Sequence, residues 1–300
     1  MKLKLDIKKT CLLFFAYIVF YLFLEILTCT YMLCTAHVAV KNDFKNYGLK
    51  ILYSTYDFKD KNYDKYIHKP IIMGNSKKNS IGIFGCSFGY GGEENFFAND
   101  LSRLTGRSVY NYSIQAAGPQ MMYYAIERNK VNFDDIDTYI YVYIGDHQER
   151  CCKFRCGPFV DVVFPKYNLR NNNTLQIVYP DFFRETSYIY RGLEYVFPFY
   201  YKNGKYAENL FCNVVLQSFE RLKNKNPNIR FILLNYSDYK TEDLIGYEQF
   251  KKAGIEIVSV NDLTGENMFQ VKYQLSPIDS HPNGTAWNMI AKELVKKSNL

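Results

Sequence analysis

The stretch SIGIFGCSFGYG, residues 80–91, establishes the type of fold. Residues 81–84 form a short apolar run after a polar turn rich in asparagine, serine and lysine, and this pattern predicts a buried β-strand. Residues 85–91 form a glycine-rich turn with a single aliphatic hydroxyl side chain, Ser87. A strand followed by such a turn and then by a helix is the first unit of an alternating β/α domain.

The alternation of strand and helix continues to the C-terminus. Four further β-rich runs predict strands at residues 109–114, 138–144, 229–234 and 255–260. Helical segments are expected at residues 95–104, 119–129, 210–222, 241–253 and 284–296. Five strands that alternate with helices predict a parallel sheet between two helical layers, a three-layer α/β/α domain over residues 79–300. Residues 151–205 interrupt the pattern, and we expect an insertion or cap there.

The N-terminal segment, residues 1–34, predicts a membrane anchor. Lysines precede an apolar run over residues 11–34, which is long enough to cross a bilayer as a helix. Lysines on that side predict a single-pass topology with the remainder of the chain outside the cytoplasm. A cleaved signal peptide is the alternative, although no clean A-x-A cleavage site follows. Glu25 interrupts the run, so either the helix tolerates it or a polytopic membrane partner pairs with it. Residues 35–78 are polar and predict a stalk or lead-in.

Composition excludes two broad classes of protein. An apolar fraction of 48% with 22% charged residues is typical of a globular chain rather than a disordered one. The net charge is +7, but lysine and arginine are scattered among acidic residues. No stretch therefore predicts a groove for nucleic acid.

Eight cysteines fall into separate groups. Three lie in the apolar N-terminal run, and Cys86 ends the first strand and is expected to pack in the core rather than to react. In an oxidising compartment the other four predict one or two disulfides of open connectivity; they are Cys151, Cys152, Cys156 and Cys212. Together with His147 they also resemble a zinc site, but paired C-x-x-C spacing is absent, so neither metal nor cofactor is expected.

Two clusters at opposite ends of the domain suggest nucleophilic catalysis. Ser87 follows the first strand at the edge of the sheet where ligands bind in open α/β folds. Asp279 and His281 lie in a Pro/Gly turn just before the last helix. A histidine with a nearby carboxylate is the arrangement of a general base and the group that orients it. Neither cluster is specific alone, because Gly/Ser turns and capping residues are common.

The order of these clusters resembles that of the SGNH/GDSL hydrolase superfamily over residues 80–297. The resemblance is to the branch whose first block reads G-C-S-F-x-x-G, matched by residues 85–91. It implies a five-stranded flavodoxin-like sheet with Ser87 as nucleophile, His281 as general base and Asp279 as its partner. Many members place the acid three residues before the histidine, whereas here the separation is two.

The second and third blocks concern the oxyanion hole. The second block fits residues 111–120, and the resemblance implies that the backbone N–H groups of Gly118 and Ser87 bind the oxyanion. The third block usually reads G-x-N-D, but residues 145–150 read GDHQER and contain no asparagine. His147 is the candidate replacement donor. Asp146 would orient it or cap a turn, and Arg150 and Gln120 are candidate supporting residues.

These features favour a membrane-anchored serine esterase or O-acyltransferase acting on an extracytoplasmic acyl ester. O-acetylated envelope glycan is the candidate substrate by family analogy and location alone. The alternative is a catalytically impaired SGNH-fold protein that binds or scaffolds in the envelope, which the missing asparagine favours. A nucleotide-binding module is a third interpretation, but the first turn lacks both G-x-G-x-x-G and G-x-x-x-x-G-K-[ST].

Overall fold

The computed structural model describes residues 7–35, 67, 69–76, 79–92, 95–152, 164–178, 189, 204–238 and 240–300. The chain divides into two compact units, each described here by itself. The first contains the N-terminal helix, and the second comprises residues 62–156, 164–179 and 203–300.

Helix α1, Ile7–Thr35, forms where the apolar N-terminal run predicted a helix. The prediction that this helix spans a membrane is corrected. Within the described residues, no helix is both long enough and apolar enough to cross a bilayer. The carboxylate of Glu25 accepts a hydrogen bond from the backbone N–H of Ile189 at 3.2 Å.

The second unit is built on a six-stranded, mostly parallel sheet. In spatial order the strands are β1 (Ile71–Met73), β3 (Val109–Asn111), β2 (Ser80–Phe84), β4 (Ile136–Tyr143), β7 (Arg230–Asn235) and β8 (Glu256–Ser259). The five predicted strands all form, and they pair in parallel. Their order is that of a doubly wound sheet: β3 is added on one side of β2, and β4, β7 and β8 are added on the other, so the order of strands reverses between β2 and β4.

Strand β1 corrects the prediction of a five-stranded sheet. It pairs antiparallel with β3 at the edge, within residues assigned from the sequence to a stalk or lead-in. Its three residues are too few to produce a recognisable alternation, so only the pairing reveals it. The rest of the predicted stalk, residues 36–66, lies outside the described residues.

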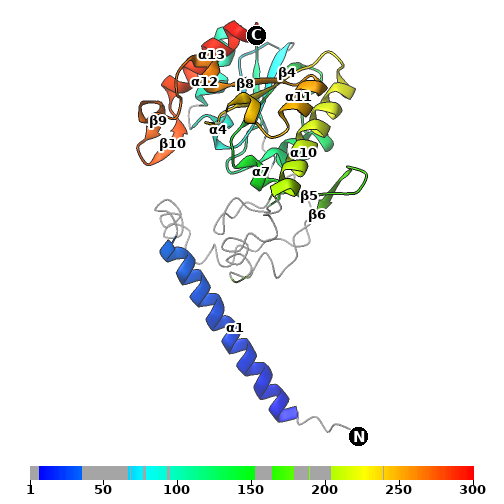
Figure 1. Ribbon diagram of the computed structural model, residues 1–300, viewed down its shortest axis with the longest axis vertical. Helices are drawn as coiled ribbons and strands as arrows, with labels where there is room; N and C mark the ends of the chain where they lie inside the picture. Colours follow the sequence, from blue (N-terminus) through cyan, green and yellow to red (C-terminus); the bar gives the residue numbers. More distant parts are fainter. Residues whose placement is uncertain are drawn as a thin grey trace. The chain divides into compact units, whose positions relative to one another are not determined.

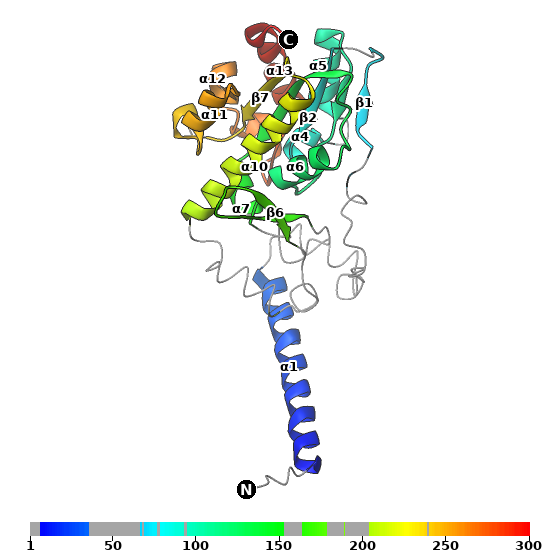
Figure 2. The same ribbon diagram turned by 90° about the vertical axis from the view of Figure 1, so that its right-hand side faces the viewer.

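Helices cover both faces of the sheet, as Figures 1 and 2 show for the upper part of each view. On one face lie α5 (Phe96–Thr105), α12 (Val260–Thr264) and α13 (Gly284–Ser298), with the Phe97 and Trp287 rings 4.6 Å apart between α5 and α13. On the other lie α6 (Pro119–Glu127), α10 (Gly204–Lys225) and α11 (Tyr247–Ala253). The predicted helix over 241–253 splits into η3 (Thr241–Asp243) and α11, because Gly246 between them has a φ of 82°.

Strand β4 shows how the sequence serves both faces. Ile140 and Val142 belong to the aliphatic core under α5 and α13. Tyr139, Tyr141 and Tyr143 alternate with them, are buried, and point to the opposite face, where the Tyr143 ring lies 5.2 Å from that of Phe211. The two cores thus differ in kind, one aliphatic and one rich in tyrosine.

Part of the predicted insertion over residues 151–205 is a β-hairpin. Strands β5 (Lys166–Leu169) and β6 (Leu175–Val178) pair antiparallel. The hairpin packs on the tyrosine-rich side, where the Tyr167 ring meets the edge of Tyr123 at 5.0 Å and Tyr206 accepts a hydrogen bond from the Leu169 backbone N–H. Residues 153–163, 179–188 and 190–203 lie outside the described residues.

The cysteines of this unit do not pair as expected from the sequence. Cys151 and Cys212 are free, so the predicted disulfides involving them are wrong. Both pack as small apolar side chains, and burial raises the pKa of each thiol, that of Cys212 to about 12. Cys156 lies outside the described residues, so a bridge to it is not tested.

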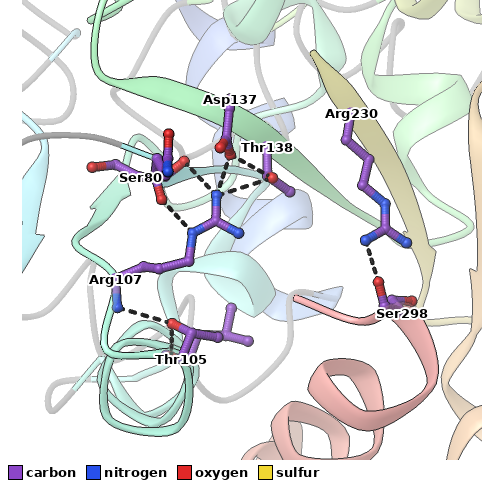
Figure 3. A network of polar contacts seen from close by, with 9 residues as sticks. Ser80, Thr105, Arg107, Asp137, Thr138, Arg230 and Ser298 are labelled. Carbon is purple, nitrogen blue, oxygen red and sulfur yellow. Dashed lines mark hydrogen bonds and ion pairs between the residues drawn. The ribbon is translucent and has the colours of Figure 1, made fainter. Parts of the chain in front are cut away.

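Arg107 ties the amino-terminal ends of two central strands together (Figure 3). Its guanidinium donates to the backbone carbonyls of Asn79 and Ser80 beside β2, and to the side chains of Asp137 and Thr138 in β4. Because the side chain is 18% exposed and makes several charge-assisted bonds, it contributes more than an exposed ion pair.

We predict that Arg107→Ala lowers the free energy of unfolding by about 1–3 kcal/mol, because it leaves partly buried acceptors without a donor. Arg103→Ala is the matched control, since Arg103 is 59% exposed and pairs only with Asp100 one turn earlier. It should cost at most about 0.5 kcal/mol. Urea denaturation of the two variants would contradict the prediction if their midpoints were equal.

Candidate active site

The first block forms a tight strand-to-helix turn. Ser87 is the first residue of the short helix α4 (Ser87–Tyr90), which follows β2 directly. Gly89 allows α4 to approach the end of β3, since a Cβ there would lie 2.6 Å from Ser113 Oγ. The buried Asn111 side chain donates to the Gly89 carbonyl at 3.1 Å and secures the helix. The serine is therefore held on a short helix fixed from below.

Asp279 and His281 lie on a strand rather than in the turn expected from the sequence. Strand β10 (Asp279–Pro282) pairs with β9 (Gln274–Ser276) in a hairpin just before α13. The register of this hairpin shifts between Asp279 and Pro282, so regular strand alternation does not describe the segment, and its local bend lets side chains two residues apart meet. Asp279 Oδ1 lies 2.6 Å from His281 Nδ1 and also accepts the His281 backbone N–H at 3.0 Å.

The two ends of the domain meet at His281. Its Nε2 lies 2.7 Å from Ser87 Oγ, although the residues are 194 positions apart. The Phe88 ring packs 4.8 Å from the imidazole and restricts its orientation. When Nδ1–H donates a hydrogen bond to Asp279, Nε2 carries no proton and can accept the proton of the Ser87 hydroxyl. The structure thus brings together the three residues that the sequence proposed as nucleophile, base and orienting acid.

Electrostatics keep Asp279 ionised. Burial acts to raise the pKa of this carboxyl, but the hydrogen bonds from the His281 backbone and ring outweigh it and hold the pKa below its usual value. Both side chains are partly exposed, with 45% of Asp279 and 38% of His281 accessible. Asp279 is therefore a carboxylate at neutral pH and can fix the imidazole tautomer.

Cys86 lies next to Ser87 but takes no part in this arrangement. It is fully buried, belongs to the aliphatic core and forms no disulfide. Burial raises the pKa of its thiol, an effect that nearby Arg150 offsets only in part. A protonated, enclosed thiol is a poor nucleophile, in contrast to the accessible hydroxyl of Ser87.

Gly118 begins helix α6, with Pro119 in the first helical position. Glycine is required for space rather than for conformation, because a Cβ would lie 2.9 Å from Arg150 Cβ and 2.4 Å from Gln120 Oε1. The Gly118 φ of −125° is open to any residue. Its predicted contribution to the oxyanion hole stays a prediction.

The supporting residues expected from the sequence form one linked group beside Gly118. The Arg150 guanidinium donates to the Ala117 carbonyl at 3.1 Å, and Gln120 donates to the Arg150 carbonyl at 2.9 Å. Asp146 pairs with Arg150 at 3.4 Å. The short helix α7 (His147–Arg150), which follows β4, is thus tied to the second-block loop.

His147 does not join the other candidates. It is fully buried, and its Nδ1 lies 2.6 Å from the Tyr141 hydroxyl rather than near Asp146. Burial, reinforced by Arg150, lowers the His147 pKa well below its usual value, and burial raises that of Tyr141. The phenol and the ring are therefore both neutral and share this one hydrogen bond, and Nε2 has no hydrogen-bond partner among the described residues.

A cavity of about 510 Å³ opens at the Ser87–His281 pair. His147 and Gly118 are not among the residues that line it. Besides Ser87 and His281, the described residues that line it are Tyr90, Gly92, Phe96, Gln115 and Leu275. Sequence reasoning missed these side chains as site residues. Only Gln115 carried a signal, since it lies within the second block.

Comparisons with known proteins give similarity of structure alone. No protein-family model matches the chain, and no curated relative matches it. Solved structures similar to it include a protein assigned to the lipolytic G-D-S-L family from Desulfitobacterium hafniense DCB-2, with 11% identity, a TM-score of 0.44, and 73% of this chain and 99% of that one covered. An acetyl xylan esterase from Butyrivibrio proteoclasticus is 10% identical with a TM-score of 0.43, and the match covers 75% of this chain and 66% of that one. A family 3 carbohydrate esterase from Clostridium thermocellum is 12% identical with a TM-score of 0.38, and the match covers 73% of this chain and 94% of that one.

We predict that Asp279→Asn lowers the rate of Ser87 modification by about 10³–10⁴-fold, because an amide no longer fixes the imidazole tautomer. The measurement is the rate of labelling by a fluorophosphonate. Asp262→Asn, in α12, is the control and should label at the wild-type rate. Equal rates for wild type and Asp279→Asn would mean that the carboxylate does not orient His281.

Proposed function

We propose that this chain is a carboxylic ester hydrolase with Ser87 as its nucleophile. The observation that carries the proposal is the continuous contact from Ser87 Oγ through the His281 ring to the Asp279 carboxylate, at 2.7 and 2.6 Å. A serine, an imidazole and a carboxylate within hydrogen-bond reach are the parts needed to activate a hydroxyl.

In the proposed mechanism, Ser87 Oγ attacks the ester carbonyl while His281 Nε2 takes the hydroxyl proton. The tetrahedral intermediate collapses when the imidazolium returns that proton to the leaving alcohol, which leaves an acyl-serine. A water molecule, deprotonated by His281, then attacks the acyl group. The bond to Ser87 breaks as the imidazolium returns the proton to Ser87 Oγ, and the acid departs. Asp279 stays ionised throughout and stabilises the imidazolium.

The oxyanion would bind to backbone N–H groups of Ser87, at the start of α4, and of Gly118, at the start of α6. Donors of this kind are worth about 2.7–4 kcal/mol each in acyl transfer. We do not assign His147 a direct role, since its ring is fully buried and is held by Tyr141. The Arg150 and Gln120 contacts support the loop that carries Gly118.

The finer parts of the function remain proposals. A sugar hydroxyl in place of water would make the protein an O-acyltransferase, with an O-acylated envelope glycan as substrate or product. An extracytoplasmic location is a further part of the proposal, and the lysines followed by an apolar run at the N-terminus support it as a secretion signal. A binding or scaffolding role is less favoured, because a binding protein has no need for a serine hydroxyl held 2.7 Å from an oriented imidazole.

We predict that Ser87→Ala abolishes both hydrolysis of p-nitrophenyl acetate and labelling by a fluorophosphonate, while the far-UV spectrum stays unchanged. His281→Ala should abolish hydrolysis as well. Cys86→Ala is the matched control at the neighbouring position and should retain labelling. Turnover that survives in Ser87→Ala would overturn the proposed function, and labelling lost only in Cys86→Ala would point to the thiol.

A further inference from the structure

The cavity beside Ser87 has two apolar side chains in its wall, Phe96 and Leu275. Phe96, at the start of α5, presents its ring there, and Leu275 of β9 lies across the cavity wall. The Phe96 ring is held in place by two glycines: a Cβ on Gly284 would lie 3.1 Å from it and one on Gly92 would lie 3.7 Å away. The ring is therefore positioned by both catalytic segments, the turn after Ser87 and the helix start after His281.

The hairpin that carries His281 bears further exposed apolar surface. Among the described residues of the α/β unit, the large apolar side chains that remain exposed are Ile72, Val271, Leu275 and Ile278. Three of these four lie within eight residues of one another on or beside the β9–β10 hairpin, and Ile278 at its tip is 83% exposed. Figure 1 shows the hairpin projecting beside α4. Exposed apolar side chains on the hairpin that also lines the cavity, through Leu275, are expected to favour an apolar ligand.

The residue types that line the cavity restrict the chemical class of ligand that can bind there. None of the described lining residues is a lysine, arginine, aspartate or glutamate, and the polar groups beyond Ser87 and His281 are the Gln115 amide and the Tyr90 hydroxyl. A charged group would find no opposite charge among these described residues. An alkyl group would lose only contact with water.

Size points the same way. Ligand sites for small organic molecules typically have volumes of about 300–1,000 Å³, and the cavity of about 510 Å³ lies within this range. An acetyl group has three non-hydrogen atoms, and a water molecule occupies about 30 Å³ in the liquid, so acetyl would fill only a small part of the space.

We infer that the substrate is an ester with an alkyl group of several carbons, which binds in this cavity against Phe96 and Leu275. The inference rests on the proposed esterase function and specifies its substrate class. The alkyl group belongs either to the acid or to the alcohol of the ester. Both give the same apolar contact, so two series of esters are needed to distinguish them.

The first measurement is kcat/KM of the wild-type chain for two series, each kept below its micelle concentration. One series varies the acid, from p-nitrophenyl acetate through butyrate and hexanoate to octanoate. The other keeps the acetyl group and varies the alcohol from ethyl to hexyl. In one series kcat/KM should rise by about fourfold per added methylene until the cavity is filled.

The second measurement repeats the responsive series with Leu275→Ser. A hydroxymethyl side chain at this position removes apolar wall, so the increase per methylene should fall to twofold or less. Ile72→Ser is the matched control, because Ile72 is similarly exposed, at 53% against 47% for Leu275, but lies on edge strand β1. It should keep the wild-type slope. Phe96→Ala should widen the cavity and shift the preferred length upward.

The outcomes separate the two proposals. If acetyl esters are hydrolysed through Ser87 but both series are flat or fall with length, the inferred substrate class is wrong and the esterase function stands. Equal slopes for Leu275→Ser and Ile72→Ser would likewise overturn it. If no ester in either series is hydrolysed and Ser87 is not labelled, the proposed function itself fails, and the inference fails with it.

Discussion

Burial of the central strands on both faces of the sheet is the constraint on which the site depends. Strands β2 and β4 have nearly every side chain enclosed, so their backbones are rigid up to the residue where each strand ends. Ser87 follows β2 and the α7 segment follows β4, the two neighbouring strands between which the order of strands reverses. A nucleophile on a flexible loop could not be held at a fixed distance from a base that comes from another part of the chain.

The second half of the site is positioned by a helix rather than by the sheet. Helix α13 packs on α5 through Trp287 and Phe97, and this fixes the chain just before it. Asn283 caps α13 by accepting the Ala286 backbone N–H, and its amide also donates to the carbonyls of Lys272 and Gln274. One side chain thus joins the helix start to the hairpin that carries Asp279 and His281. The contact between Ser87 and His281 follows from the packing of α5 against α13.

The contrast between the two cores explains the position of His147. The face covered by α6 and α10 is lined by tyrosines of β4, whose hydroxyl groups need partners when buried. His147 supplies one for Tyr141 and is drawn into the interior. Arg150, one helical turn further, reaches the loop of Gly118 instead. The third block therefore contacts the site through Arg150. His147, at the position where the superfamily that the sequence resembles has asparagine, packs in the core here.

The sequence by itself determined the five parallel strands, the helices between them and the candidates Ser87, Asp279 and His281. Each of these leaves a local trace, such as an apolar run, a glycine turn or a polar cluster before a helix. It did not determine β1, the β9–β10 hairpin or the direction of the His147 ring, because short strands and buried polar contacts depend on partners distant in sequence. The lining of the cavity was also decided only in three dimensions. Phe96, Gln115 and Leu275 come from three separate segments, and their common property, contact with the same space, exists only once α5 and α13 have packed together.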